Sequence, residues 1–576
     1  MIKEKDKPTG YPSVDKPWLK YYSEEAINDR LPECTMYEYV YNMNRNRTNA
    51  IALNYYGNKI SYGQLFHHIK KTANAFANQG IKKGDVVTIM SLETPETIYC
   101  IYALNFLGAV ANMVYISLPE KEIITDLQNT ESKLLIYLDV IAKKIETIED
   151  QIPVNTIIKL DTSMSMPQPL KIAYRLKNRQ VNKSNTKSIS YDNFTRPLKI
   201  IDVQQVKYEK NMPAFIVHTS GTTGEPKSVV HGNDGVNALV FQYKKSGMQF
   251  DENDSFLTWV PPFLSIGLCI DLHMPLCLGM CEILCVNPDI DEVTRIFVKN
   301  KPNHFLGAPQ NLLNIIQNTR NMGYCVTFAA GGETATTDQE ELIKTQLSKK
   351  GAIAKFITGY GMSEVCATVT TGMNHVNKLG TIGIPLCKTI AKVVKQDTMT
   401  ELTYNEVGEM CFHTPNLMLG YLKNKVATDE IIKKHQDGLL WLHTGDLGFI
   451  DEEGFLHFKG RIKRIYLVKG PDGGMYKVFP TGVEELLMKH PLIHQSAVIV
   501  IEDPTNINMQ IAFITLKANT TTNQELLKSI DIFCKDNLPI HSIPLEYIIL
   551  KKMPLKVNGK IDYQTLEKEY KSKLLK

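Results

Sequence analysis

Hydrophobic and polar positions along this chain follow two repeating patterns, one typical of strands and one typical of helices. Residues 51–120 interleave short β-rich runs with amphipathic helical runs. Val86–Met90 is expected to form a strand, and Pro95–Leu107 a helix that ends before Gly108. Similar alternation continues past residue 350. The pattern predicts an α/β fold, with layered sheets of mainly parallel strands.

The alternation breaks over residues 162–199, which are rich in Ser, Asn, Lys and Pro. Between Lys171 and Lys187 the chain carries six basic residues and no acid. One interpretation is a solvated excursion between two strands, which the short apolar face favours. The other is a basic amphipathic segment that makes peripheral contact with an anionic membrane or a partner.

A second change of pattern lies near Gly460. Residues 451–454 have the composition of a hairpin turn between short strands, and a basic stretch follows at 461–464. Beyond it the pattern is that of a smaller α+β unit. Because 576 residues are too many for one core, we expect two domains, over residues 1–460 and 461–576.

Composition narrows the class of protein. Hydrophobic residues make up 43% of the chain and charged residues 22%, which fits a soluble globular protein. A formal charge of +4 gives no reason to expect nucleic acid as a partner. No run of about 18 apolar residues suggests a membrane span. The charged first seven residues do not resemble a secretory signal, so we expect a cytoplasmic location.

The eleven cysteines are expected to be reduced thiols. Cysteine and histidine recur every four residues at Cys269, His273, Cys277, Cys281 and Cys285. On one continuous helix they would share a face and could hold a metal ion. However, Gly279 is expected to end the helix, and residues 281–286 have the pattern of a strand. We therefore favour buried thiols over a metal site.

Candidate chemistry is concentrated in a loop of small hydroxyl residues and glycines at 219–227. The apolar run at 214–217 predicts a buried strand directly before it. Glycines let backbone N–H groups turn toward an anion, and hydroxyls and a lysine add donors, so the loop suits polyphosphate. It is not a Walker loop, because Pro226 separates the last glycine from the lysine. The phosphate-binding candidates are Thr219, Ser220, Gly221, Thr222, Thr223, Gly224 and Lys227.

Residues 218–231, with the sequence HTSGTTGEPKSVVH, resemble the signature of the adenylate-forming superfamily, which includes acyl-CoA synthetases. Ser228 stands where the family usually has glycine. The resemblance covers most of the chain, with the motifs in the family's order. It implies a large N-terminal domain of layered α/β sheets with a small β-barrel part, and a small α+β C-terminal lid domain. It also implies that the protein uses ATP and Mg²⁺, with coenzyme A as a co-substrate.

A second motif, residues 359–364 with the sequence GYGMSE, resembles the family's adenine and α-phosphate signature. By this resemblance Gly359, Tyr360 and Gly361 hold the nucleotide, with the Tyr360 ring on adenine. Ser363, in place of the more common threonine, would contact the α-phosphate, and Glu364 would hold Mg²⁺. One carboxylate suffices for a hard cation that also bridges phosphate oxygens.

Two more motifs resemble those that hold the rest of the nucleoside. Gly331, Gly332 and Glu333 resemble the family's turn against adenine, although such a Gly-Gly pair alone marks many turns. Asp446, in Thr444-Gly445-Asp446, resembles the ribose-binding aspartate, and a carboxylate offers two acceptors to a vicinal diol. Arg461 resembles the arginine on the ribose side.

The C-terminal part carries three further candidates by resemblance. Lys560, in the stretch at 554–560, matches the catalytic lysine of the closing signature. Lys463 matches the hinge about which the C-terminal domain rotates between two half-reactions, and Gly470 matches the segment that lines the thiol tunnel. Extra residues at 469–480 leave open whether Gly470 or Gly474 lines it, and whether coenzyme A is the acceptor.

The acyl pocket departs from the family's pattern at Leu264, where many relatives have histidine. No acid occurs between Trp259 and Ile270, and a buried substrate ammonium without a partner would be costly. We therefore expect a fatty or other apolar carboxylic acid, activated as an acyl-adenylate and transferred to coenzyme A. The alternatives are transfer to the phosphopantetheine of a carrier protein, or nucleotide binding without catalysis.

Overall fold

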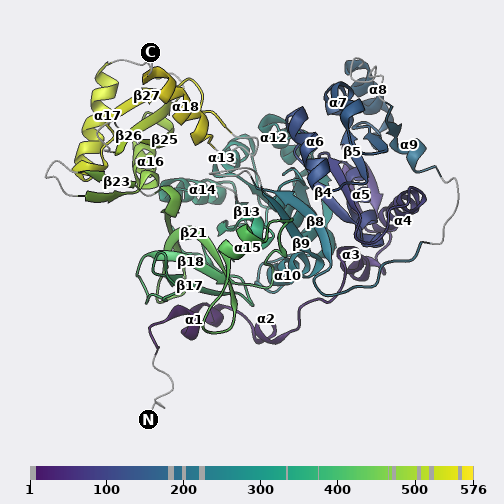
Figure 1. Cartoon of the computed structure of the whole chain (residues 1–576), viewed down its shortest axis with the longest axis horizontal. Helices are drawn as coiled ribbons and strands as arrows, with labels where there is room; N and C mark the ends of the chain where they lie inside the picture. Colours follow the sequence, from purple (N-terminus) through teal and green to yellow (C-terminus); the bar gives the residue numbers. More distant parts are fainter. Residues whose placement is uncertain are drawn as a thin grey trace, which may run out of the picture.

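The computed structural model describes residues 8–178, 187–196, 203–219, 227–331, 335–373, 375–464, 466–469, 475–502, 508–517, 520, 524–555 and 561–574. Figure 1 shows a large N-terminal part and a smaller C-terminal part, which holds α16, α17 and α18. The two parts meet near the end of β22 (Leu456–Arg461), beside the predicted boundary. The small part has strands and helices mixed, as the α+β pattern predicts.

An eight-stranded sheet carries the phosphate loop, and most of its neighbouring strands are parallel. The antiparallel pairs are β8 with β9 and β9 with β19, at one edge of the sheet. In spatial order its strands are β19 (Gly420–Tyr421), β9 (Ser228–Gly232), β8 (Pro213–His218), β4 (Val110–Met113), β3 (Val86–Met90), β5 (Leu134–Leu138), β6 (Thr156–Leu160) and β7 (Ile189–Ser190).

A nine-stranded sheet forms the second layer of the large part, and its six central strands are parallel. In spatial order the nine strands of this sheet are β16 (Ile384–Pro385), β15 (Thr370–Thr371), β14 (Phe356–Tyr360), β13 (Thr327–Ala330), β12 (His304–Gly307), β10 (Ser255–Thr258), β11 (Cys281–Leu284), β1 (Ile51–Tyr55) and β2 (Asn58–Ser61). The two large sheets confirm the predicted layers of mainly parallel strands.

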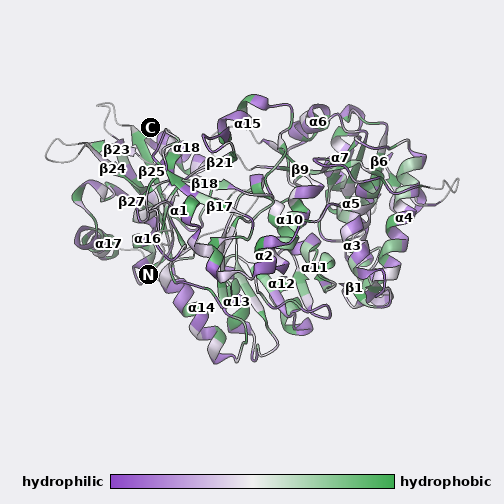
Figure 2. Cartoon of the chain, turned by 90° about the horizontal axis from the view of Figure 1, so that it is seen from below, coloured by the Kyte–Doolittle hydropathy of each residue, from purple (hydrophilic) through white to green (hydrophobic). Residues whose placement is uncertain are grey.

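Helices cover these sheets, and α5 and α10 are buried on almost every side. Figure 2 shows that α14, at the periphery, is largely hydrophilic. The helices of the large part are α1 (Pro12–Asp15), α2 (Glu24–Asn28), α3 (Met36–Asn44), α4 (Tyr62–Asn78), α5 (Pro95–Leu107), α6 (Glu120–Asn129), α7 (Ala142–Ile148), α8 (Gln168–Lys177), α9 (Tyr191–Phe194), α10 (Asn233–Lys244), α11 (Met274–Cys277), α12 (Ile290–Asn300), α13 (Pro309–Asn318), α14 (Thr337–Lys349) and α15 (Lys425–Ile431).

Local sequence signals explain where α5 begins and ends. The Thr94 hydroxyl accepts a hydrogen bond from the backbone N–H of Thr97, and Pro95 occupies the first helical position. Gly108 ends the helix with a φ of 75°, a left-handed conformation that glycine adopts without steric cost. The predicted strand Val86–Met90 and the predicted helix Pro95–Leu107 are therefore both confirmed.

A five-stranded antiparallel sheet positions the ribose motif. The long strand β21 pairs with β20 along its first half and with β22 along its second half. Within the described residues no strand pairing closes this sheet, so the predicted small β-barrel is here an open sheet. Its strands are β17 (Ile390–Val394), β18 (Gly408–His413), β20 (Ile432–Lys434), β21 (Leu440–Ile450) and β22.

The C-terminal part is built on a three-stranded sheet with hydrophobic clusters on both of its faces. Arg464 joins the segment after β22 to this part, because its guanidinium lies 2.7 Å from a carboxylate oxygen of Glu484. The elements are β23 (Tyr466–Lys469), β24 (Met475–Val478), α16 (Pro480–Lys489), β25 (Ile493–Glu502), β26 (Asn508–Leu516), α17 (Gln524–Asn537), β27 (Glu546–Ile549) and α18 (Tyr563–Leu574).

Within the stretch 162–199, the described residues 168–177 form helix α8, which lies between β6 and β7 in the chain and at the periphery of the large part (Figure 1). Leu170, Ile172 and Leu176 of this helix are exposed, and Arg175 forms an ion pair with Asp161. Peripheral membrane contact through this segment stays a prediction. Among the described residues, no helix combines the length and the apolar character that crossing a bilayer requires.

All eleven cysteines are free thiols. As predicted, Gly279 follows a helix end, with a φ of 78°, and a strand begins at Cys281. The ring nitrogens of His273 contact the Tyr102 hydroxyl at 2.8 Å and the side-chain oxygen of Asn237 at 3.0 Å. Hydrogen bonding within the core therefore accounts for this histidine.

Candidate active site

A cavity of about 1400 Å³ lies where the two large sheets, the five-stranded sheet and the start of the C-terminal part come together. Part of its lining is polar and contains described residues of every N-terminal motif singled out above. Its members are Thr219, Lys227, Gly331, Gly359, Tyr360, Gly361, Ser363, Glu364, Thr444, Gly445 and Arg461. The sequence motifs, which are up to 242 residues apart, thus share one cavity wall (461 − 219).

Another part of the cavity lining is apolar. Three of these apolar residues, Ile266, Ile270 and Met274, lie on consecutive turns of the segment 266–274, which is π-helical over Gly267–His273. The apolar lining consists of Tyr243, Met248, Phe250, Phe256, Leu264, Ile266, Ile270, Met274, Phe305, Leu306 and Ile357. Leu264, which stands where many relatives have histidine, is part of this wall.

The base of the phosphate loop is a continuation of the β8–β9 hairpin. The backbone N–H of Thr219 donates to the carbonyl oxygen of Lys227 at 3.0 Å, and the backbone N–H of Lys227 donates to the Thr219 hydroxyl at 3.1 Å. These two bonds fix both ends of the loop.

Several predicted site residues lie outside the described residues. They are Ser220, Gly221, Thr222, Thr223 and Gly224 of the loop, together with Gly332, Glu333, Gly470 and Lys560.

Glu364 is almost completely buried, with 6% of its surface exposed, yet it lines the cavity. Tyr421 of β19 donates its hydroxyl to Oε1 of Glu364 at 2.6 Å. The Lys227 ammonium lies 4.8 Å from the centre of the Tyr421 ring. Tyr421 therefore joins the candidate metal ligand to the loop lysine. Burial, with Glu364 next to it, raises the pKa of the Tyr421 hydroxyl.

His231 of β9 supports the turn that carries Ser363 and Glu364. A ring nitrogen of His231 lies 2.7 Å from the carbonyl oxygen of Ser363, and the other lies 3.1 Å from the Cys366 sulfur. A Cβ atom at position 361 would lie 1.7 Å from the carbonyl oxygen of Ala367. Only glycine fits at Gly361, because the turn folds back directly over it.

The ribose motif is brought together by the pairing of β21 with β22. Asp446 lies opposite Arg461 in the register of these strands, and Oδ1 of Asp446 lies 3.2 Å from Nε of Arg461. The Tyr360 hydroxyl donates to Oδ2 of Asp446 at 2.6 Å. Burial, with the Asp446 charge next, raises the pKa of Tyr360. The predicted adenine, ribose and arginine positions therefore form one contact network.

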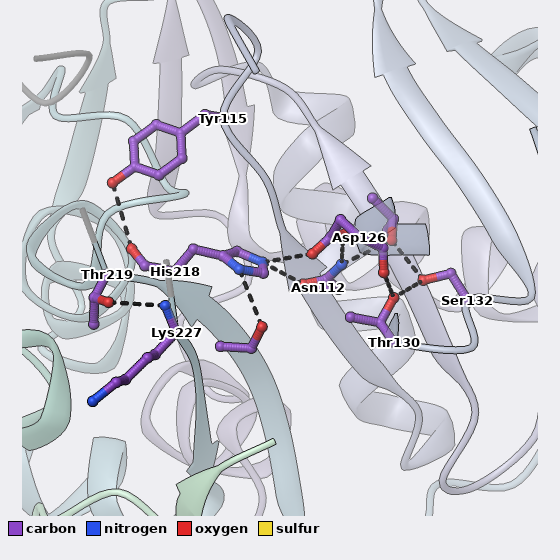
Figure 3. Close-up of polar contacts among 10 residues, drawn as sticks. Asn112, Tyr115, Asp126, Thr130, Ser132, His218, Thr219 and Lys227 are labelled. Carbon is purple, nitrogen blue, oxygen red and sulfur yellow. Dashed lines mark hydrogen bonds and ion pairs between the residues drawn. The ribbon is translucent and has the colours of Figure 1, made fainter. Parts of the chain in front are cut away.

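The sequence predictions did not assign a role to a polar network behind the phosphate loop (Figure 3). His218 lies between Asn112 of β4, Asp126 of α6 and Ser228 of β9. Its Nε2 atom lies 2.8 Å from Oδ1 of Asn112 and 3.5 Å from Oδ1 of Asp126, and its Nδ1 atom lies 3.3 Å from the Ser228 hydroxyl. Burial lowers the pKa of His218 and raises that of Asp126.

Sequence reasoning also missed Tyr421 and His231. Tyr421 is separated from Glu364 by 57 residues and His231 from Ser363 by 132, so no local pattern links them. For Ser228 a signal did exist, because serine in place of the family's usual glycine adds a hydroxyl at the end of the loop. Its partner His218 is the first residue of the same motif.

One group in the described part of the chain has donors arranged as in a metal site: Glu409, Cys411 and His443. The Nδ1 atom of His443 lies 2.8 Å from Oε2 of Glu409, and its Nε2 atom lies 2.9 Å from a ring nitrogen of His435. Both imidazole nitrogens thus have protein partners. Hydrogen bonding therefore accounts for the cluster. The cluster contacts the ribose motif, because the backbone N–H of Gly445 donates to the Glu409 carboxylate.

Comparison with known families agrees with this arrangement. The AMP-binding enzyme family matches residues 41–422, and the AMP-binding enzyme C-terminal domain matches residues 482–560. The chain belongs to the AMP-binding enzyme family. The resemblance to adenylate-forming enzymes, inferred from motifs, is therefore confirmed. The positions of the two matches are compatible with a boundary near Gly460, which stays a prediction.

Two curated CoA ligases are similar to the chain over almost its whole length. The long-chain-fatty-acid–CoA ligase of Bacillus subtilis (strain 168) is 26% identical over 557 residues, which cover 95% of this chain and 96% of that protein. The 4-coumarate–CoA ligase 4 of Arabidopsis thaliana is 25% identical over 529 residues, which cover 90% and 87%.

A solved CoA ligase has the same fold. The crystal structure of the anthranilate CoA ligase AuaEII in complex with anthranoyl-AMP aligns with a TM-score of 0.79 and 19% identity. The alignment covers 94% of this chain and 98% of that one. The structural match extends over both the large and the small part.

Proposed function

We propose that this AMP-binding enzyme is an AMP-forming acid–CoA ligase. In the first half-reaction a substrate carboxylate attacks the α-phosphorus of ATP, and pyrophosphate leaves. In the second, the thiolate of coenzyme A attacks the acyl carbon of the adenylate, which gives a thioester and AMP. The observation that carries the proposal is one cavity whose lining combines the nucleotide-type polar motifs with a set of apolar side chains.

The first half-reaction mainly requires stabilisation of negative charge in the transition state, because this charge grows on the phosphate oxygens as pyrophosphate leaves. We assign Lys227 and the loop N–H groups to the leaving phosphates, and Ser363 to the α-phosphate. Lys560 is the proposed catalytic lysine, delivered by rotation of the C-terminal part about Lys463. Tyr360, Asp446 and Arg461 would hold the nucleoside.

The residues present suit a magnesium ion at Glu364. A carboxylate on the cavity wall is a hard oxygen ligand, and the Tyr421 hydroxyl fixes its direction through one oxygen. Magnesium would supply charge neutralisation at the phosphate oxygens. The contribution of the chain is to hold this carboxylate in place through Tyr421, whose ring lies 4.8 Å from the Lys227 ammonium.

A fatty or other apolar acid is the proposed substrate class. The apolar wall around Ile266, Ile270 and Met274 offers no charge to a substrate tail. Asp271 belongs to the same segment but turns away from the cavity, and its Oδ2 accepts backbone hydrogen bonds from Trp259 and Val260 at 2.7 and 2.8 Å. An α-amino group would therefore lack a partner there.

Coenzyme A is the proposed acceptor, because the curated relatives named above are CoA ligases. No observation favours a carrier protein. The proposed route for the thiol passes near Gly470, in the segment after Lys463.

ATP–pyrophosphate exchange across a panel of carboxylic acids tests the first half-reaction. We expect exchange with apolar acids, and exchange with α-amino acids alone would refute the substrate class. Adding coenzyme A or a holo carrier protein separately, with a labelled acid, tests the acceptor. If ATP binds but no acid in a broad panel yields AMP, the catalytic proposal is wrong.

A further inference from the structure

The polar network behind the phosphate loop determines which atom of His218 carries its proton. Asn112 Nδ2 donates to Oδ2 of Asp126 at 2.7 Å and to the Thr88 hydroxyl at 2.9 Å. Asn112 Oδ1 is therefore the atom that faces His218, and it accepts from Nε2–H at 2.8 Å. In neutral His218 the hydrogen is on Nε2, and Nδ1 is an acceptor.

This tautomer sets the direction of the Ser228 hydroxyl. Because Nδ1 accepts, the Ser228 O–H points toward His218, at 3.3 Å. Only oxygen lone pairs of Ser228 are then available to the cavity, which both residues line. A phosphate oxygen offers lone pairs too, so this arrangement does not suit an anion.

Protonation of His218 reverses the arrangement. With a proton on Nδ1, the imidazolium donates to the Ser228 oxygen, and the Ser228 hydrogen is free to point into the cavity. The site then gains one positive charge and one hydrogen-bond donor at the end of the loop. Both features stabilise phosphate, and the negative charge of phosphate in turn stabilises the imidazolium.

The groups around His218 favour a neutral imidazole in the free protein and allow it to be protonated when the ligand binds. Asp126 of α6 lies 3.5 Å from Nε2 and favours the imidazolium, whereas burial disfavours it and lowers the pKa of the free protein. The Tyr115 hydroxyl donates to the backbone carbonyl oxygen of His218, at 3.4 Å, rather than to its ring. The Lys227 side chain extends away from the ring (Figure 3), toward Tyr421.

We propose that His218 and Ser228 form a proton-linked phosphate anchor: binding of the ATP phosphates draws one proton from solvent onto Nδ1 of His218, which frees the Ser228 hydroxyl to donate to a phosphate oxygen. The inference rests on the proposed function, since it takes polyphosphate as the occupant of the loop. His218 is a positioning residue that acts through Ser228, and Ser228 is a direct phosphate ligand.

Isothermal titration calorimetry of the full chain with Mg²⁺ and α,β-methylene ATP tests this at pH 7.5. Comparing the binding enthalpy in buffers of different ionisation enthalpy gives the number of protons taken up. We expect an uptake of roughly half to one proton per nucleotide for the unchanged protein. His218→Gln keeps a donor toward Asn112 but cannot titrate, so we expect almost no uptake and about tenfold weaker binding.

Two further variants separate the anchor from a merely structural role. Ser228→Ala removes only the hydroxyl, and we expect roughly fivefold to tenfold weaker nucleotide binding. His67→Gln, at an exposed histidine of α4, should match the unchanged protein in both proton number and affinity. Equal proton uptake by the unchanged protein and His218→Gln, or no uptake by either, would overturn the proposal.

Ser228→Ala decides the matter if His218→Gln does not fold, because unchanged affinity in that variant also overturns the proposal. These measurements use a nucleotide analogue and need no turnover. Failure of the acid panel would therefore refute the proposed reaction but leave the measured proton uptake unaffected. Absence of proton uptake would refute the phosphate anchor but leave the proposed reaction unaffected.

Discussion

Asp446 and Arg461 lie directly opposite each other on β21 and β22, with Oδ1 of the aspartate 3.2 Å from Nε of the arginine. Only 1% of the Asp446 surface is exposed, so the guanidinium and the Tyr360 hydroxyl together compensate a buried carboxylate. The carboxylate proposed to bind ribose thus has its orientation fixed from two sides.

Asp446→Asn should weaken ATP binding by about tenfold or more, because the amide keeps one acceptor for Tyr360 but loses the charge that faces Arg461. Calorimetric titration with α,β-methylene ATP measures the change. The matched control is Asp397→Asn, at an exposed aspartate on the rim of the same cavity. If both variants bind the nucleotide as well as the unchanged protein does, Asp446 does not hold the ribose.

Tyr421→Phe tests whether the Tyr421–Glu364 hydrogen bond positions the proposed metal ligand. The ring beneath Lys227 remains, while the hydroxyl that donates to Oε1 of Glu364 is lost. We expect kcat for acid activation to fall about tenfold and the Mg²⁺ concentration for half-maximal rate to rise. A rate and a Mg²⁺ dependence like those of the control Tyr404→Phe, outside the cavity lining, would exclude this positioning role.

Much of the fold follows from local signals. The Thr94 cap, Pro95 and Gly108 bound α5 as predicted, and alternation of strands and helices gave the parallel layers. Motif resemblance also placed Asp446 and Arg461 in one site. The contacts of Tyr421, His231 and His218 could not be predicted in this way, since each joins segments distant in sequence through the tertiary packing.

The open five-stranded sheet shows another limit of sequence reasoning. Strand β21 is long enough to pair with β20 and β22 along different halves, and each half has its own register. Alternating polarity predicts strands but not which half of a long strand a neighbour joins. Whether such a sheet closes depends on pairings that only the folded chain reveals.

Gly361→Ala should disrupt the second motif without a change in charge. The new Cβ would lie 1.7 Å from the Ala367 carbonyl oxygen, so the turn carrying Ser363 and Glu364 must move. We expect a loss of about 1–3 kcal/mol in the free energy of unfolding and at least tenfold lower acid activation. Gly482→Ala is the matched control, because a Cβ there meets no atom within 4 Å. Equal stability and activity of the two variants would contradict the close approach.

Asp271 makes stability depend on pH, with a direction that follows from its burial. Burial raises the pKa of its carboxyl to about 8, whereas an exposed aspartate titrates near pH ~4. The folded protein therefore keeps a proton that the unfolded chain releases over this range. The stabilising contribution is complete below about pH 4, declines by up to about 1.4 kcal/mol per pH unit as pH rises, and is lost above about pH 8.

Asp271→Asn should flatten this dependence, because the amide resembles the protonated acid and keeps an acceptor for the N–H groups of Trp259 and Val260. Urea denaturation of both proteins between pH 5 and 9 measures it. We expect the variant to gain stability relative to the unchanged protein as pH rises toward 8. Glu93 and Glu282, whose pKa values burial raises, are present in both proteins, but the Asp271 charge raises these pKa values further, so the difference includes their response to its loss. A stability difference that stays constant across this pH range would mean that Asp271 is already ionised in the folded state.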